Sequence, residues 1–95
     1  MIRIVAARTV PAECTAAYEE LARELVRASA AEDGCASYTL NRKVDDPQGY
    51  CFVEVWRDRV ALEAHQASEY FKELVPKLGE MAVAGTSHVD VYEEV

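Results

Sequence analysis

The sequence predicts an α+β fold in which one antiparallel sheet carries helices on a single face. Segments with strand-like alternation and segments with helix-like spacing follow one another as strand, helix, strand, strand, helix pair and strand. The chain has 95 residues, so we expect a single domain over residues 1–95 with one core. Hydrophobic residues make up 51% of the chain, more than a core of this size needs. A partner subunit is therefore expected to cover a further apolar face.

The first strand is predicted over Ile2–Val10, where both alternating rows are mainly apolar, as in a strand covered on both faces. A helix is expected to open at Pro11, because the fixed φ and missing N–H of proline suit a first helical turn. Asp33 and Gly34 are expected to end this helix. The predicted inward stripe of this helix consists of Cys14, Ala17, Tyr18, Leu21, Leu25 and Ala28.

A β-hairpin is predicted next, with strands over Cys35–Val44 and Tyr50–Arg57 and a loop at Asp45–Gly49. In the expected register Val44 faces Tyr50 across the loop. The pairs that follow are Tyr38 with Trp56, Leu40 with Glu54, and Arg42 with Phe52. Arg42 then lies diagonally across from Glu54.

Two short helices and a last strand complete the chain. Asp58 is expected to cap the helix that carries His65, and Ser68 to cap the next helix, which Pro76 is expected to kink or divide. The last strand is predicted over Ser87–Val95. The apolar stripe of the second helix consists of Phe71, Leu74, Val75 and Leu78. This order is the split βαβ, ferredoxin-like plan, and its uncovered sheet face predicts a homodimer in which two sheets pack together.

The charge balance and the residue composition disfavour several kinds of binding partner and cofactor. The chain has 17 acidic and 10 basic residues, a net charge of −7, and its basic residues are scattered, so neither nucleic acid nor an anionic membrane surface is expected to bind it. No apolar run of signal-peptide or membrane-spanning length occurs. Three cysteines without a close pair favour reduced thiols in a cytoplasm. The sequence contains no phosphate loop, dinucleotide fingerprint or metal-ligand spacing, so no cofactor and no metal are expected.

Two side chains are candidates for proton transfer. His65 is expected to point between helix and sheet, where a neutral imidazole would serve as a general base, although a core histidine held by one hydrogen bond is the commoner outcome. Glu54 interrupts an apolar strand, and burial would raise its pKa toward a value that suits proton transfer. The commoner outcome is a structural ion pair between Glu54 and Arg42, which we favour.

Other side chains could bind a substrate. Asn41 could donate its amide to an oxyanion, or simply be a surface residue of the hairpin. Aromatic side chains could line a pocket that stacks a flat ring, although aromatic residues at this spacing also serve as plain core. These candidates are Tyr18, Tyr38, Trp56, Tyr70 and Phe71.

One block of the sequence resembles a known family. The segment Phe52-Val53-Glu54-Val55-Trp56 is followed by Ala61-Leu62, Ala64-His65, Ser68 and Tyr70-Phe71, and it is preceded by Asp33-Gly34-Cys35 with Tyr38 and Leu40. These motifs resemble those of the antibiotic biosynthesis monooxygenase family of dimeric α/β barrels, and the resemblance covers essentially the whole chain. The motifs are fairly specific to this superfamily and much less specific to one reaction.

The resemblance implies a ferredoxin-like protomer, a homodimer whose sheets form a barrel, and oxidation of quinols or anthrone-like polycyclic phenols by O2 without flavin, haem or metal. It also implies residue roles. His65 would take or relay the proton, Asn41 or Tyr38 would stabilise the oxyanion, and Trp56 and Phe71 would hold the ring.

The sequence also departs from the family pattern. Tyr70 stands where many members have a second histidine, so a mechanism with two histidines does not carry over. The related haem-degrading enzymes have a tryptophan at the position of His65 and a haem-ligating histidine near Val75, and neither is present here. Because relatives of this fold include isomerases and stress-induced proteins, two alternatives remain: an isomerase or lyase of a small metabolite, and a non-catalytic ligand-binding dimer.

Overall fold

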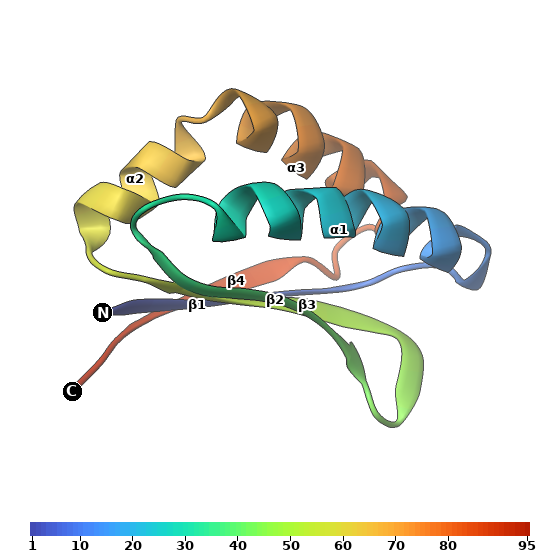
Figure 1. The fold of residues 1–95 in the computed structure, drawn as a ribbon. Helices are drawn as coiled ribbons and strands as arrows, with labels where there is room; N and C mark the ends of the chain where they lie inside the picture. Colours follow the sequence, from blue (N-terminus) through green and yellow to red (C-terminus); the bar gives the residue numbers. More distant parts are fainter.

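The computed structural model describes residues 1–95 as one four-stranded antiparallel sheet with three α-helices on one face (Figure 1). The strands lie in the order β2-β3-β1-β4. The elements are β1 (Ile2–Thr9), a 3-10 turn (Ala12–Cys14), α1 (Thr15–Ala30), β2 (Cys35–Lys43), β3 (Asp46–Trp56), α2 (Arg59–Gln66), α3 (Glu69–Met81) and β4 (His88–Glu93). The predicted α+β, ferredoxin-like fold is confirmed.

Local sequence signals determine where the helices begin. The Asp58 side chain accepts a hydrogen bond from the Ala61 amide at 2.8 Å, and the Ser68 hydroxyl accepts one from the Phe71 amide at 3.4 Å, so both predicted caps are confirmed. Pro11 precedes a 3-10 turn instead of opening α1 itself. Pro76 lies inside α3, which continues across it, so of the two expected outcomes, a kink or a division, the division does not occur.

The predicted hairpin register is wrong by two residues. Tyr38 pairs with Glu54, Leu40 with Phe52 and Arg42 with Tyr50. The register then shifts between Arg42 and Lys43, so that Lys43 lies opposite Asp46 at the turn, and this irregularity accounts for the difference from the predicted pairing. β3 begins inside the predicted loop, and its first residues bond to the end of β1. The Val10 amide donates to the Gln48 carbonyl at 2.8 Å, and the Gln48 side chain donates to the Val10 carbonyl at 3.1 Å. A shift of two residues keeps each side chain on its predicted face of the sheet.

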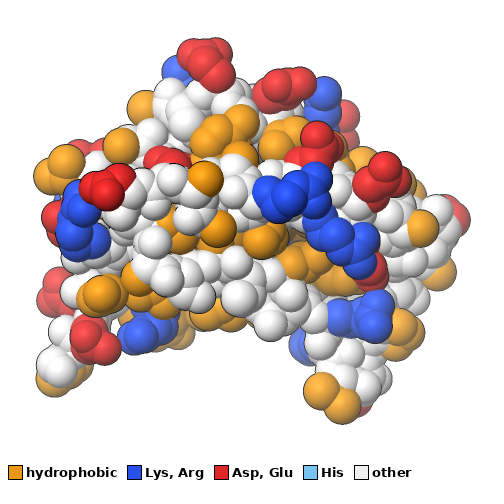
Figure 2. All heavy atoms as spheres, in the orientation of Figure 1, with side chains coloured by type: hydrophobic (Ala, Val, Ile, Leu, Met, Phe, Trp, Pro, Cys, Tyr) orange, Lys and Arg blue, Asp and Glu red, His pale blue; other side chains and the backbone are white.

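The core lies between the helices and the sheet. On α1 the buried row is Tyr18, Ala22, Leu25 and Ser29. Ala17, predicted to face inward, is exposed. The Tyr18 ring packs on the Tyr50 ring with centroids 5.1 Å apart, and with Tyr18 facing the core the preceding helix position lies toward solvent. Figure 2 shows hydrophobic side chains in the seam between the helix layer and the sheet, with charged groups over the outer surface of the helices.

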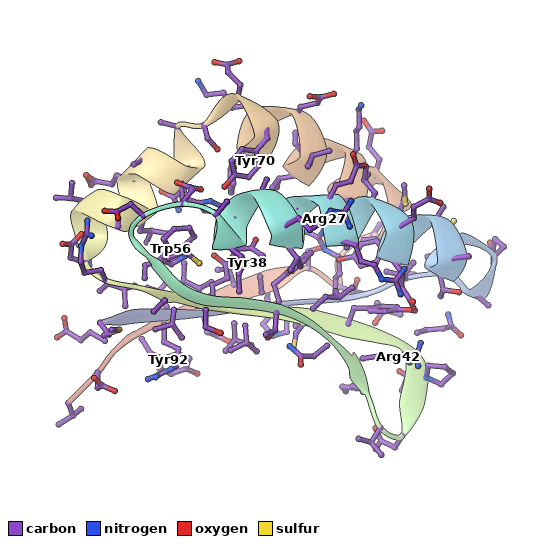
Figure 3. All side chains as sticks on the ribbon, in the orientation of Figure 1. Arg27, Tyr38, Arg42, Trp56, Tyr70 and Tyr92 are labelled. Carbon is purple, nitrogen blue, oxygen red and sulfur yellow. The ribbon has the colours of Figure 1, made fainter.

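The other face of the sheet has no helix over it (Figure 1). Half-buried apolar residues of β1 and β3 lie on this open face beside the exposed Tyr92 of β4, which Figure 3 places on the side of the sheet away from the helices. β4 is also an edge strand, and its Val89 and Val91 are 61% and 55% exposed. None of the helices has the length and apolar character needed to cross a membrane.

Candidate functional site

A cavity of about 150 Å³ lies between the sheet and the helices. Ten of its fourteen lining residues are hydrophobic, so a ligand there would be largely shielded from water. The other four are Arg8 of β1, Glu54 of β3, and His65 and Gln66 of α2, and Tyr38 of β2, one of the ten, adds a hydroxyl group. The predicted site residues His65, Glu54, Tyr38 and Phe71 all line this cavity.

The imidazole of His65 is 1% exposed, and one of its nitrogens is firmly held. His65 Nδ1 lies 2.8 Å from Glu32 Oε2 and 3.0 Å from the Tyr70 hydroxyl. The Tyr70 hydroxyl donates to the same Glu32 oxygen. Because an ionised carboxylate only accepts hydrogen bonds, Glu32 favours the tautomer in which Nδ1 carries the proton and donates it toward the carboxylate.

The other nitrogen of His65 is free. Nε2 is buried and has no hydrogen-bond partner in the protein. The nearest charged atom is Glu54 Oε1 at 4.0 Å, which is beyond hydrogen-bond distance. A buried polar atom without a partner is rare in proteins, and at the wall of a cavity it marks a place for a ligand. With Nδ1 protonated, Nε2 has the lone pair that a general base needs.

Glu54 is 6% exposed beside this nitrogen. Burial raises the pKa of its carboxyl, while a hydrogen bond from Trp56, the nearby His65 and the Tyr38 hydroxyl oppose that rise. The Trp56 indole N–H donates to Glu54 Oε1 at 3.0 Å. Burial, followed by the charge of Glu54, raises the pKa of Tyr38 well above its usual value, so the Tyr38 hydroxyl remains a proton donor.

The expected ion pair between Arg42 and Glu54 is not formed. Arg42 Nη1 lies 2.9 Å from Glu19 Oε2, and the Tyr50 hydroxyl donates to the same oxygen at 2.6 Å. The corrected register explains the difference, because it places Arg42 opposite Tyr50, nearer the hairpin turn than Glu54. Glu54 therefore has no cationic side chain to neutralise it other than a protonated His65.

Aromatic rings hold the imidazole in place. The Trp56 ring lies against His65 with centroids 4.3 Å apart, Phe71 meets it edge-on at 5.0 Å, and Tyr38 lies 5.6 Å away. Figure 3 shows Trp56 and Tyr38 in the layer between sheet and helices, and Tyr70 on α3. Trp56 and Tyr70 contact His65 without lining the cavity, so they position the base instead of touching a ligand.

Two predicted site residues lie outside this cluster. Asn41 is exposed on the open face of the sheet, where its Nδ2 donates to the Thr39 hydroxyl at 3.0 Å. The sheet therefore separates its amide from His65. Tyr18 does not line the cavity and packs instead on Tyr50 near the hairpin.

Three polar residues of the site, Glu32, Arg8 and Gln66, were not predicted from the sequence. Glu32 follows the end of α1 in an irregular segment, and no periodicity marks it as a partner for a histidine 33 residues further on. Arg8 could have been found, because it ends the row Ile2, Ile4, Ala6, Arg8 that faces the helices. No group of three or more histidine, cysteine or acidic side chains is arranged to hold a metal ion.

Comparisons with known proteins agree with this architecture. Residues 1–77 match the family described as antibiotic biosynthesis monooxygenase. The chain is 35% identical over 63 residues to "Putative monooxygenase YcnE" of Bacillus subtilis (strain 168), with 66% of each chain covered. It is 32% identical over 73 residues to the uncharacterized protein sll1783 of Synechocystis sp., with 77% of this chain and 49% of the relative covered.

The matched segment thus spans about half of the Synechocystis protein and about two thirds of the Bacillus protein. Among solved structures, a crystal structure described as antibiotic biosynthesis monooxygenase superimposes with a TM-score of 0.91. It shares 32% sequence identity with this chain, and the match covers 100% of this chain and 99% of that one.

Proposed function

The chain belongs to the antibiotic biosynthesis monooxygenase family, and from this premise we propose that it is a cofactor-independent monooxygenase that oxidises a small quinol or related phenol with O2. Family membership supports a monooxygenase-like function in general terms. The substrate class and the residue roles rest on the geometry of the cavity. The single observation that carries the proposal is the buried, unpartnered Nε2 of His65 in the cavity wall.

The first step is removal of a proton from the substrate. A phenolic hydroxyl within hydrogen-bond distance of Nε2 transfers its proton to that nitrogen. The imidazolium that forms is stabilised by the Glu32 carboxylate at Nδ1 and by the Glu54 carboxyl group 4.0 Å from Nε2. Tyr38, which lines the cavity and keeps its proton, can donate a hydrogen bond to the developing phenolate.

The second step is electron transfer from the phenolate to O2. A deprotonated hydroquinone is a strong reductant, so it gives one electron to O2 and the resulting radical pair combines at a ring carbon. One oxygen atom stays on the ring and the other leaves as water, and the product is a hydroxyquinone. The substrate supplies all four electrons needed to reduce O2, so the balance requires no external reductant. The mainly apolar wall shields the intermediates from solvent.

We also propose that the functional unit is a homodimer whose open sheet faces pack together. The apolar residues of the open face, Val5, Ala7, Cys51, Val53 and Val55, are only half-buried in the single chain. They form the middle of a face that no helix covers (Figure 1). A second copy would bury this face by a two-fold contact.

An oxygen-electrode assay over a panel of one-ring and two-ring hydroquinones tests the proposal, with a chelator present. We expect the protein alone to accelerate oxygen uptake, and His65→Gln to lower the rate by at least about a hundredfold, the usual minimum for loss of a general base. His88→Gln is the matched control, because His88 is an exposed histidine on β4. Equal rates for His65→Gln and the parent would show that the base is wrongly assigned. Turnover under argon would instead favour an isomerase or lyase.

A further inference from the structure

Arg8 places a positive charge in the wall of the cavity. It belongs to the row of β1 that faces the helices, and it follows Ile4 and Ala6, which also line the cavity. Its side chain is half-buried. The strand thus places two apolar residues and then a cationic residue along the wall of the same cavity.

Nothing in the protein neutralises this guanidinium. Arg8 takes part in none of the ion pairs of the chain. Its neighbour Tyr18 is a phenol whose pKa is raised by burial, a rise that the nearby Arg8 opposes, so Tyr18 supplies no negative charge. The carboxylate of Glu19 is already occupied by Arg23, Arg42 and the Tyr50 hydroxyl.

Arg8 and the proposed base lie toward opposite ends of the cavity. Ile4 pairs with Glu54, whose Oε1 lies 4.0 Å from His65 Nε2, whereas Arg8 pairs with Tyr50. Four residues of an antiparallel strand span about 14 Å at roughly 3.4 Å per residue. The long side chain of Arg8 shortens this separation. The cavity therefore has a proton acceptor toward one end, a cation toward the other and an apolar wall between them.

We propose that Arg8 binds a carboxylate of the substrate, which makes the preferred substrate an aromatic hydroxy acid with its reacting hydroxyl and its carboxylate at opposite ends. A guanidinium matches a carboxylate with two parallel hydrogen bonds. The cavity of about 150 Å³ is small, so we expect a ring system of one or two rings. The identity of the reacting hydroxyl rests on the proposed function, whereas the carboxylate site does not.

Calorimetric titration tests the carboxylate site without any turnover. The probes are a hydroxynaphthoate with its two groups at opposite ends of the ring system and the neutral carboxamide of the same skeleton. We expect the parent protein to bind the carboxylate at least about tenfold more tightly than the amide, and Arg8→Gln to lose that preference. Arg3→Gln is the matched control, since Arg3 lies on the same strand but on the open face, and we expect it to keep the preference.

The outcomes separate this inference from the proposed function. Equal binding of carboxylate and amide by the parent, no binding of the carboxylate, or an unchanged preference in Arg8→Gln would each overturn the carboxylate site. Thermal unfolding of the Arg8 variant confirms that it is folded. His65→Gln should keep the preference, because His65 is not the anion-binding residue. If the preference holds while no hydroquinone or hydroxy acid consumes oxygen, the site stands and the monooxygenase proposal fails.

Discussion

At the scale of single residues, the two nitrogens of His65 have different environments. Nδ1 is held by Glu32 and Tyr70, while Nε2 is buried at the cavity wall without a partner. An imidazole fixed in one tautomer, with an unpartnered nitrogen beside a cavity that the same residue lines, is prepared to accept a proton from a ligand. Glu32 and Tyr70 act through His65, so we describe them as positioning residues.

Replacing Glu32 with Gln should lower kcat by roughly tenfold to a thousandfold and leave KM nearly unchanged. The carboxylate both fixes the tautomer of His65 and stabilises the imidazolium, yet it does not line the cavity. Steady-state kinetics with the hydroquinone that the parent oxidises fastest measures both parameters. Glu24→Gln, an exposed residue on α1, is the control. A rise in KM at constant kcat would contradict the positioning role.

Replacing Glu54 with Gln should stabilise the protein at neutral pH. The native pKa of Glu54 is raised above the ordinary 4.5 chiefly by burial, so ionisation opposes folding. This opposition is absent below pH 4.5 and complete above the raised native pKa. Urea unfolding at pH 7 and near pH 4 should therefore show a stabilisation at the higher pH that shrinks at the lower one. Glu63→Gln, exposed on α2, should show neither effect. A uniform effect at both pH values would show that ionisation is not the cause.

The sequence alone identifies His65 and Glu54 as candidates, because a histidine and a carboxylate are conspicuous among apolar neighbours. It does not identify Glu32, whose contact with His65 depends on how the turn after α1 meets α2. Asn41 is the opposite case: its chemistry suits an oxyanion, but its amide lies on the open face of the sheet, away from His65. Residue type suggests the chemistry, and tertiary packing decides which groups meet.

At the scale of elements, the close approach of α2 to the start of β2 places His65 over the sheet. Gly34 lies against Ala61, and a Cβ at position 34 would come 2.3 Å from the Ala61 Cβ. The Arg57 amide also donates to the Gly34 carbonyl at 2.8 Å. Absence of a side chain at this position therefore lets the helix that carries His65 pack closely.

Replacing Gly34 with Ala should destabilise the fold by about 1–3 kcal/mol, the usual effect of overpacking. It should also lower activity, because α2 must move away and take His65 with it. Gly79→Ala is the matched control. Its Cβ would meet nothing within 4 Å inside α3, so the better helix propensity of alanine should stabilise the fold by about 0.5–1 kcal/mol. Urea unfolding measures both changes. An unchanged free energy of unfolding in Gly34→Ala would show that α2 can move away from residue 34 at no cost, which would contradict this account.

The elements were largely predictable, and their details were not. Caps at Asp58 and Ser68 and the alternation in β1 are local signals, so they can be read from short segments. The hairpin register contains an irregularity between Arg42 and Lys43 that the turn residues alone do not reveal. The hydrogen bonds between Gln48 and Val10 and the packing of Tyr18 on Tyr50 join residues that lie far apart in sequence. Local patterns do not contain such contacts.

At the scale of the whole molecule, the helices cover one face of the sheet and leave the other uncovered. Light scattering should give about twice the 10.6 kDa mass of one chain if the open faces pack together. Val53→Glu, which places a charge in the middle of that face, should shift the protein to a monomer. Val44→Glu is the control, because Val44 is fully exposed at the hairpin turn. A parent protein that is a monomer in solution would contradict the proposed homodimer.

We propose above all that this small chain inserts an oxygen atom from O2 into its substrate without any cofactor. The most direct measurement is mass spectrometry of the product formed under isotopically labelled O2, with the purified protein, a chelator and a hydroquinone as substrate. We predict one labelled oxygen atom in the product, and a rate of labelled product formation that falls in His65→Gln. A quinone without label, or equal labelling in the absence of the protein, would contradict the claim.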